Sequence, residues 1–186
     1  KLVEEIGDGV FLPRGFLNQL LGFLDAEGIL YDVVYEHPDF EKRVFSNSIV
    51  LSAPQAIVVK KMIEHNQGVA VAPPGSGKTI IGLDLIAKRG LPALVLVHRK
   101  ELLEQWVERI QTFLNIPKSK IGRFHGIKKK LGTDITIGLI QSFARTTDKS
   151  IFNAKFGTIV VDECHHIPAS TFRKAIASLN PRHLYG

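Results

Sequence analysis

The chain has 186 residues, enough for one sizeable domain with a small appendage. Its apolar content of 45% and charged content of 23% are typical of a globular chain. No apolar run approaches the roughly 20 residues that cross a bilayer, which excludes a membrane-spanning helix. A single cysteine, Cys164, excludes an internal disulfide and fits a reducing compartment, so we expect a cytoplasmic protein.

Charge is unevenly distributed along the chain. Residues 1–41 hold nine acidic and two basic residues, a net charge of −7, whereas the remainder has a net charge of +13. Part of the basic excess lies at Lys118, Lys120, Arg123, Lys128, Lys129 and Lys130. A basic body suggests a polyanionic partner, because each neutralised phosphate releases counterions. A lysine run is also typical of a solvated loop, so both interpretations stay open.

Residues 1–46 are predicted to form a small β-α-β module. Val10–Leu12 is a candidate strand, and a helix that starts near Pro13 carries apolar residues at helical spacing up to Gly28. Ile29–Tyr35 is the second candidate strand. Such a unit is too small to bury much apolar surface alone, so we expect it to dock on the larger body.

Residues 47–186 alternate predicted helices and strands. We predict helices over Pro54–Glu64, Lys78–Arg89, Lys100–Phe113 and Ala169–Ser178, and strands over Gly68–Val71, Ala93–Val97, Ile121–Phe124, Ile135–Leu139 and Thr158–Val161. Apolar strands interleaved with amphipathic helices indicate an α/β fold with a mostly parallel sheet covered by helices on both faces. Ligands of such sheets bind beyond the carboxyl ends of the strands.

The stretch Ala72–Thr79, APPGSGKT, is the most informative motif. It lies between a predicted strand and a predicted helix, the context in which a glycine-rich turn binds nucleotide phosphates rather than serving as an ordinary turn. The glycines let backbone N–H groups point at an anion, and the helix N-terminus adds partial positive charge. Lys78 would reach the β- and γ-phosphates, and the Thr79 hydroxyl would ligate Mg²⁺. The other candidate phosphate-binding residues are Pro74, Gly75, Ser76 and Gly77.

A second motif follows the predicted strand Thr158–Val161. Asp162 and Glu163 are two carboxylates at the end of an apolar strand, which is what nucleotide hydrolysis requires opposite a phosphate loop. Asp162 would hold the hydrated Mg²⁺, and Glu163 would orient or deprotonate the attacking water. With Lys78, they are the candidate catalytic residues.

Together these motifs resemble motifs I and II of superfamily 2 helicases and translocases of the DEAH-like type. Val97–Trp106 is similar to the motif Ia region, and Ile137–Ser142 to a later nucleic-acid-contacting motif, although Leu139 replaces the usual threonine. Within this superfamily, the chain resembles the branch that holds XPB-like repair helicases and the motor subunits of restriction enzymes. The resemblance covers about residues 50–186. It implies a RecA-like lobe that uses ATP and Mg²⁺, acts on nucleic acid (DNA rather than RNA), and works with a second RecA-like lobe that follows it.

The resemblance also implies roles for individual residues. Gln55 lies where the family has an adenine-recognising glutamine, although a surface position in a helix's first turn explains its residue type equally well. Arg99, Gln141 and Ser142 lie where relatives contact a nucleic-acid backbone, and such contacts position a strand without reading its sequence. His165 lies where the family couples the nucleotide state to the partner lobe.

Two other features have structural interpretations. A zinc site at Cys164, His165 and His166, with His125, lacks the paired ligand spacings that structural zinc sites use. Trp106 lies on the apolar face of its predicted helix, which favours core packing over base stacking.

We therefore expect an ATP-dependent DNA helicase or translocase lobe. The alternative is a nucleic-acid-binding or annealing module whose ATP site gates affinity without unwinding. A small-metabolite kinase is disfavoured by the acidic motif and by Gln141-Ser142.

Overall fold

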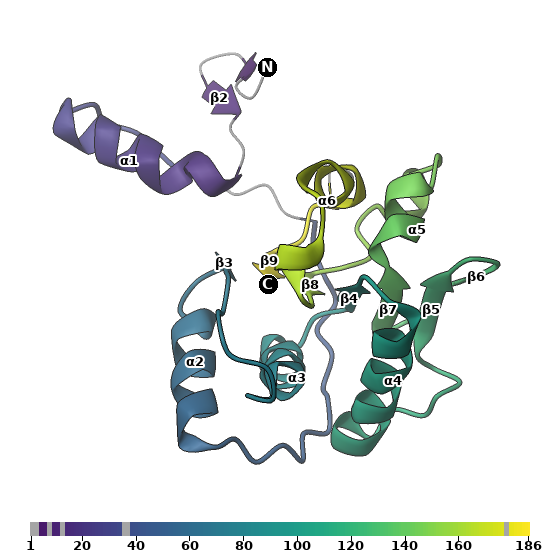
Figure 1. Cartoon of the computed structure of the whole chain (residues 1–186). Coiled ribbons are helices and arrows are strands. Elements are labelled where there is room, and N and C mark those ends of the chain that lie inside the picture. The colour runs from purple at the N-terminus through teal and green to yellow at the C-terminus, as the bar shows by residue number, and fades with distance from the viewer. Residues whose placement is uncertain (1–3, 7–8, 12–13, 35–37, 177–178) are drawn as a thin grey trace. The chain divides into compact units, whose positions relative to one another are not determined.

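The computed structural model describes the whole chain except residues 1–3, 7–8, 12–13, 35–37 and 177–178 (Figure 1). The chain divides into two compact units, residues 1–36 and 37–186. This division precedes the boundary predicted after residue 46, because the segment around Arg43 packs on the larger unit. The Arg43 N–H donates to the Gly90 carbonyl over 2.8 Å, and its Nε lies 2.9 Å from Asp134 Oδ1.

The smaller unit contains a hairpin and a helix. Strands β1 (Glu4–Ile6) and β2 (Gly9–Phe11) pair antiparallel, and the 3₁₀ turn η1 (Arg14–Phe16) leads into α1 (Leu17–Ala26). Gly28 adopts a φ of +65° after the helix, as expected of a helix terminator. The predicted strand at 29–35 was wrong: 29–34 is not a strand, since no described strand lies beside it, and Tyr35 is outside the described residues. The β-α-β expectation is therefore replaced by a hairpin followed by a helix.

The larger unit is built on a seven-stranded sheet with the order β3-β9-β8-β4-β7-β5-β6 (Figure 1). All neighbouring strands are parallel except β5 and β6. The strands are β3 (Gln67–Gly68), β4 (Ala93–Val97), β5 (Gly122–His125), β6 (Lys128–Lys130), β7 (Ile135–Leu139), β8 (Thr158–Val161) and β9 (His183–Tyr185). The helices are α2 (Ala53–Ile63), α3 (Lys78–Arg89), α4 (Lys100–Leu114), α5 (Ile140–Arg145) and α6 (Ala169–Ile176), with 3₁₀ turns η2 (Ser150–Phe152) and η3 (Cys164–His166).

The central strand β4 separates two apolar layers because successive side chains of a strand point to opposite faces. Val95 and Val97 pack with α3 and α4, whereas Leu94 and Leu96 pack with α5 and α6. Figure 1 shows α2, α3 and α4 below the sheet and α5 and α6 above it. The α/β fold with a parallel sheet covered on both faces is confirmed.

Three details differ from the sequence prediction. The buried strand expected over 68–71 was wrong: β3 ends at Gly68, and Val71 is 97% exposed, because β3 is an edge strand paired only with short β9. Strands β6 and β9 and helix α5 were not predicted. No helix within the described ranges is long and apolar enough to cross a membrane.

Candidate nucleotide site and the adjoining sheet edge

The phosphate loop ends at the first residue of α3, as its sequence predicts. Gly75 and Gly77 have φ values of +80° and +81°, the left-handed region in which glycine avoids the steric cost of a side chain. A Cβ at Gly77 would lie 2.4 Å from the Gln55 amide nitrogen, so this position also lacks space. Ser76 Oγ is shielded from solvent and has no hydrogen-bond partner among the described residues. The loop therefore turns at Gly75 and Gly77, just before α3, and leaves the Ser76 hydroxyl without a hydrogen-bond partner in the described structure.

The phosphate-loop lysine and the acidic motif meet in space. Lys78 Nζ lies 3.1 Å from Glu163 Oε1 and 3.2 Å from the Ala72 carbonyl oxygen. Both side chains of the ion pair are about a quarter exposed, at 27% and 25%, so solvent or a ligand can reach them. Hydrogen bonding from Lys78, opposed by partial burial, lowers the pKa of Glu163 below its ordinary value. Glu163 is therefore a carboxylate at neutral pH.

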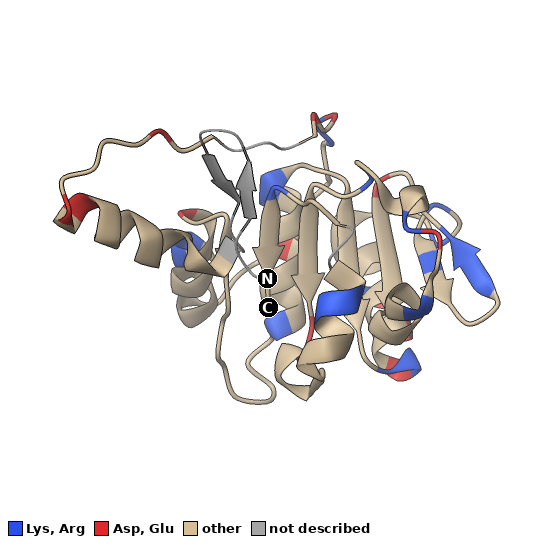
Figure 2. Cartoon of the chain, turned by 90° about the horizontal axis from the view of Figure 1, so that it is seen from above, with Lys and Arg blue, Asp and Glu red and all other residues tan. Residues whose placement is uncertain are grey.

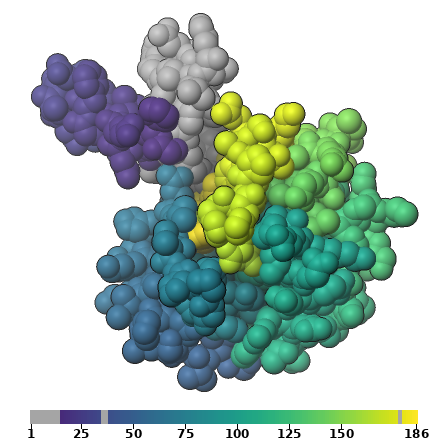
Figure 3. All heavy atoms as spheres, viewed as in Figure 1, coloured from purple at the N-terminus to yellow at the C-terminus, as the bar shows by residue number. Residues whose placement is uncertain are grey.

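Glu163 itself has an unusual backbone conformation. Its φ is +52°, in the left-handed region that non-glycine residues seldom adopt. It lies one residue beyond Asp162, between the end of β8 and the start of η3, and its carboxylate reaches Lys78 at the amino end of α3. Figure 3 shows the phosphate-loop side (blue) and the segment after β8 (yellow-green) on the same face of the larger unit.

Asp162 is held by the core. Trp106 is 1% exposed, which confirms core packing, but its Nε1–H also donates to Asp162 Oδ2 over 2.8 Å. The same indole covers Gly82 of α3, where a Cβ would lie 2.8 Å from its ring. One buried side chain thus touches both the phosphate-loop helix and the first acidic residue.

Gln55 is tied to the phosphate loop. Its Nε2 donates to the Ser76 carbonyl over 2.9 Å, and its Oε1 accepts the Ser52 N–H over 2.9 Å as part of a capping box at the start of α2. The side chain therefore bridges α2 and the loop.

The predicted nucleic-acid residues come together at the carboxyl ends of neighbouring strands. Arg99 follows β4, Gln141 follows β7, and these strands pair in parallel. Gln141 Nε2 donates to the His98 carbonyl over 3.3 Å, which fixes one strand end to the other. Ser142 lies in the first turn of α5, and its carbonyl accepts the Thr146 hydroxyl over 2.8 Å.

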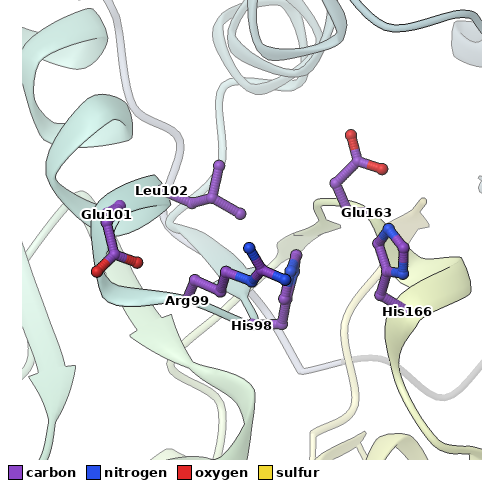
Figure 4. Close-up of a pocket in the computed structure, with 6 residues that line it drawn as sticks. All are labelled: His98, Arg99, Glu101, Leu102, Glu163 and His166. Carbon is purple, nitrogen blue, oxygen red and sulfur yellow. The ribbon is translucent and has the colours of Figure 1, made fainter.

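A hollow of about 360 Å³ lies between this edge and the acidic motif (Figure 4). It is lined by His98, Arg99, Glu101, Leu102, Glu163 and His166. In Figure 4 the Arg99 guanidinium and the His98 ring both project toward the side on which Glu163 and His166 lie. Burial is the main cause that lowers the pKa of His98 below its ordinary value, and Arg99 contributes. Glu163 and one of the nucleic-acid candidates, Arg99, thus line the same cavity, whereas Gln141 and Ser142 are not among its lining residues.

His165 contacts the acidic motif directly. Its Nδ1 lies 3.5 Å from Glu163 Oε2, and its ring centroid lies 4.0 Å from that of His166. Glu163, His165 and His166 place one potential metal-ligand atom each within 4.8 Å of one another, whereas Cys164 is not in this group. The zinc set considered from sequence therefore does not assemble in the described structure.

Sequence reasoning missed several residues of this site. The Trp106 bond to Asp162, and the positions of His98 and His166 on the shared cavity, arise from contacts between distant elements. No spacing rule signals such contacts. Only the run of polar residues after β4 and after β8 offered a hint, because both follow strands that pair with each other.

A family model described as "Type III restriction enzyme, res subunit" matches residues 48–186. A "Putative DNA 3'-5' helicase Rad25" of Halobacterium salinarum is 36% identical over 129 residues, which is 69% of this chain and 21% of the relative. A "DNA 3'-5' helicase XPB" of Mycobacterium tuberculosis is 33% identical over 112 residues, covering 57% of this chain and 20% of the relative. The chain thus spans about a fifth of the length of these relatives.

Solved structures share the fold. The UvsW helicase from Bacteriophage T4 superposes with a TM-score of 0.72 at 18% identity and covers 97% of this chain and 72% of that one. The Sulfolobus solfataricus SWI2/SNF2 ATPase core, solved in complex with dsDNA, gives a TM-score of 0.62 at 21% identity and covers 76% and 32% of the two chains. At such identities the likeness establishes the fold, an α/β lobe with a mostly parallel sheet.

Proposed function

The chain belongs to the Type III restriction enzyme, res subunit family, and from that premise we propose that its larger unit binds and hydrolyses Mg·ATP to move a protein along DNA. Residues 48–186 form the first RecA-like lobe of a superfamily 2 helicase or translocase. The observation that carries the proposal is the Lys78–Glu163 contact of 3.1 Å, which joins the phosphate loop to the acidic motif.

The loop residues suit a triphosphate. Gly75 and Gly77 supply the backbone curl, Ser76 Oγ supplies a shielded donor, and the amino end of α3 adds positive potential. Lys78 is paired with Glu163, so a γ-phosphate that approaches Lys78 would take over that interaction. Glu163 would then be freed beside the phosphate, where a carboxylate can accept a proton from water.

Thr79 and Asp162 suit Mg²⁺, because both offer oxygen ligands, as this hard cation prefers. When bound, Mg²⁺ neutralises charge on the β- and γ-phosphates during transfer. The Trp106 hydrogen bond holds one Asp162 oxygen and leaves the other for hydrated metal. Gln55 stands beside the loop with one donor left for adenine.

DNA is the proposed track, because the relatives are named DNA helicases and the larger unit is basic. Arg99, Gln141 and Ser142 follow strand ends on the edge that carries the nucleotide site, so they suit backbone contacts. His165 contacts the Glu163 carboxylate, so it suits the relay of nucleotide state toward a second lobe.

Replacing Glu163 by glutamine tests the proposal in the whole protein. DNA-stimulated ATP turnover should fall about 100-fold or more, because a general base contributes that much, while ATP affinity is retained. Glu101→Gln is the matched control, since that carboxylate lines the same cavity and should leave turnover unchanged. Undiminished turnover in Glu163→Gln would refute the assignment.

A second RecA-like lobe is the proposed source of a further cation for the transition state. An arginine supplied from another domain can raise hydrolysis by roughly 1,000-fold or more. The chain of 186 residues alone should therefore bind ATP yet hydrolyse it slowly, and the whole protein should be far faster. Equal turnover of the two would contradict a two-lobe site.

A further inference from the structure

The edge of the sheet farthest from β3 ends in a hairpin that the nucleotide chemistry does not use. We call β5 (Gly122–His125), the turn at 126–127 and β6 (Lys128–Lys130) the lysine hairpin. All three residues of β6 are exposed lysines. Figure 2 shows β6 as a blue strand at the end of the sheet. This hairpin therefore presents a concentrated positive charge on an outer edge.

The positive charges of the hairpin face one another. The register places Arg123 opposite Lys130 and His125 opposite Lys128, so these four side chains lie on one face of the hairpin. Like charges directly opposite each other in an antiparallel pair destabilise it. Glu104 lies 3.0 Å from Arg123 as an ion pair and also acts on His125, and in the described part of the chain no ion pair is formed by Lys128 or Lys130. The fold thus tolerates uncompensated positive charge here.

This face is hollowed rather than flat. A depression of about 290 Å³ is lined by Lys118, Ser119, Ile121, Arg123, Lys128 and Lys130. Lys130 Nζ donates to the Ser119 carbonyl over 3.2 Å, which holds one wall to the other. Four cationic side chains around one concave surface provide donors for the oxygens of a phosphodiester chain.

The basic face continues toward the predicted nucleic-acid edge. Burial, followed by the nearby charges of Lys100 and Lys128, keeps the pKa of His125 below its ordinary value. Lys100 comes directly after Arg99, which lines the cavity of the nucleotide site. Lys100, just after the carboxyl end of β4, and Lys128 of the lysine hairpin thus both act on His125.

The hairpin tip is apolar. Ile127 is fully exposed and lies between Gly126, with a φ of +50°, and Lys128. Apolar side chains can pack against or between bases, and a fully exposed isoleucine at a hairpin tip is accessible for such a contact. An apolar tip next to a lysine strand combines base-contacting and phosphate-contacting chemistry.

We propose that the lysine hairpin is an additional nucleic-acid contact, with Lys118, Lys128 and Lys130 on the sugar-phosphate backbone and Ile127 against a base step. The proposal rests on the proposed function and adds a contact beyond Arg99, Gln141 and Ser142. Such a contact positions the strand without reading its sequence. It would extend the footprint from the nucleotide edge to the side of the lobe.

A simpler role for the lysines is protection of an edge strand. β6 is the last strand of the sheet, and charged side chains on an edge prevent pairing with other chains. Charge of either sign serves that purpose, whereas a phosphate contact requires positive charge. Charge reversal therefore separates the two roles.

The test compares Lys128→Glu/Lys130→Glu with the matched control Lys60→Glu/Lys61→Glu, which also reverses two charges, at exposed lysines in the last turn of α2. Duplex DNA binding by the whole protein is measured from 50 to 200 mM salt. We expect hairpin reversal to weaken binding at least about tenfold and to reduce the salt slope by about 2, since each lost phosphate contact removes about 0.9. The control should change neither quantity.

ATP turnover without DNA should be unchanged in the hairpin variant, because these lysines lie outside the nucleotide site. A folded, monomeric hairpin variant with the wild-type salt slope would overturn the proposal and leave edge protection as the role. If wild-type protein shows no DNA-dependent ATP turnover, the proposed function fails, while the binding comparison still tests the hairpin.

The contact of Ile127 with a base step is tested with duplex DNA that contains 2-aminopurine, which fluoresces more strongly when it is unstacked. Wild-type protein should raise this fluorescence on binding, and Ile127→Ser should raise it less while leaving the salt slope unchanged. An equal rise with both proteins would contradict the tip contact.

Discussion

The two ends of α3 differ in how their polar side chains are hydrogen-bonded. At the amino end, Lys78 and Glu163 are each about a quarter exposed, and Ser76 Oγ has no partner among the described residues. At the carboxyl end, Arg89 donates to the Ile63 and His65 carbonyls over 2.8 and 2.7 Å and to the Tyr185 hydroxyl over 2.8 Å.

The amino end of α3 therefore has the features of a ligand site, whereas the carboxyl end has those of a structural contact. Donors at the carboxyl end are engaged by the Ile63 and His65 carbonyls and the Tyr185 hydroxyl, so their loss should cost stability. Interactions at the amino end can be exchanged for ligand, so their loss should cost binding. The Tyr185 hydroxyl also donates to the His65 carbonyl over 2.8 Å, which fixes β9 beside the end of α2.

The largest effect is expected for Lys78→Ala. Loss of its charge-assisted contacts to the phosphates should weaken ATP binding by roughly 100-fold, or about 3 kcal/mol, as measured by calorimetry. Lys88→Ala is the control at the other end of the same helix, where the amine lies 2.7 Å from buried Asp84. That control should lower thermal stability and keep ATP affinity. If both variants lost ATP affinity to the same extent, the proposed difference between the two ends of α3 would be wrong.

Arg89→Leu should show the reverse pattern. Removing the guanidinium leaves the Ile63 and His65 carbonyls without this donor and should lower the free energy of unfolding by about 2–3 kcal/mol. Urea denaturation measures this loss, and ATP affinity of the folded protein should be unchanged. Lys60→Gln, at an exposed lysine of α2, controls for loss of charge. A loss below about 1 kcal/mol would show that the network is not a stabilising clamp.

Trp106→Phe should have a smaller effect, on both metal-dependent activity and stability, because Trp106 is a core residue that also contacts Asp162. Phenylalanine keeps most of the apolar contact but cannot donate to Asp162, and a lost hydrogen bond of about 1 kcal/mol should raise the Mg²⁺ needed for half-maximal ATP turnover several-fold. A loss of stability with no shift in Mg²⁺ dependence would make Trp106 a packing residue only. As the only tryptophan in the chain, Trp106 should also report Mg·ATP binding by its fluorescence.

The smallest effect concerns pH. Burial lowers the pKa of His98, so the unfolded chain takes up the proton more readily than the folded one. Stability should therefore be greatest above the ordinary histidine pKa of about 6.5 and should decline as pH falls through it. His98→Gln should flatten part of that decline in urea denaturation between pH 7.5 and 5.5. If the free energy of unfolding of the variant depended on pH as steeply as that of the wild type, His98 would not contribute to the decline.

Local sequence predicted most elements of the larger unit because their patterns are strong. The bounds of α3, β4, β7 and β8 agree with the prediction, since each carries a clear apolar period and a defined start or stop. Weak patterns failed. The exposed stretch from Val69 to Val71 looked like a buried strand, and three consecutive lysines gave no sign of β6.

Sequence alone determined which residues are the candidates for the chemistry of this protein. Glycines that permit a positive φ, a lysine at a helix start and two carboxylates after an apolar strand are needed in a fixed local order, so a linear pattern reveals them. Tertiary structure decided which of them meet. The Lys78–Glu163 contact, the Trp106 hydrogen bond to Asp162 and the clamp at Tyr185 join residues far apart in the chain. Such contacts depend on the order of the strands in the sheet, which is set by packing of the whole lobe and not by any local pattern.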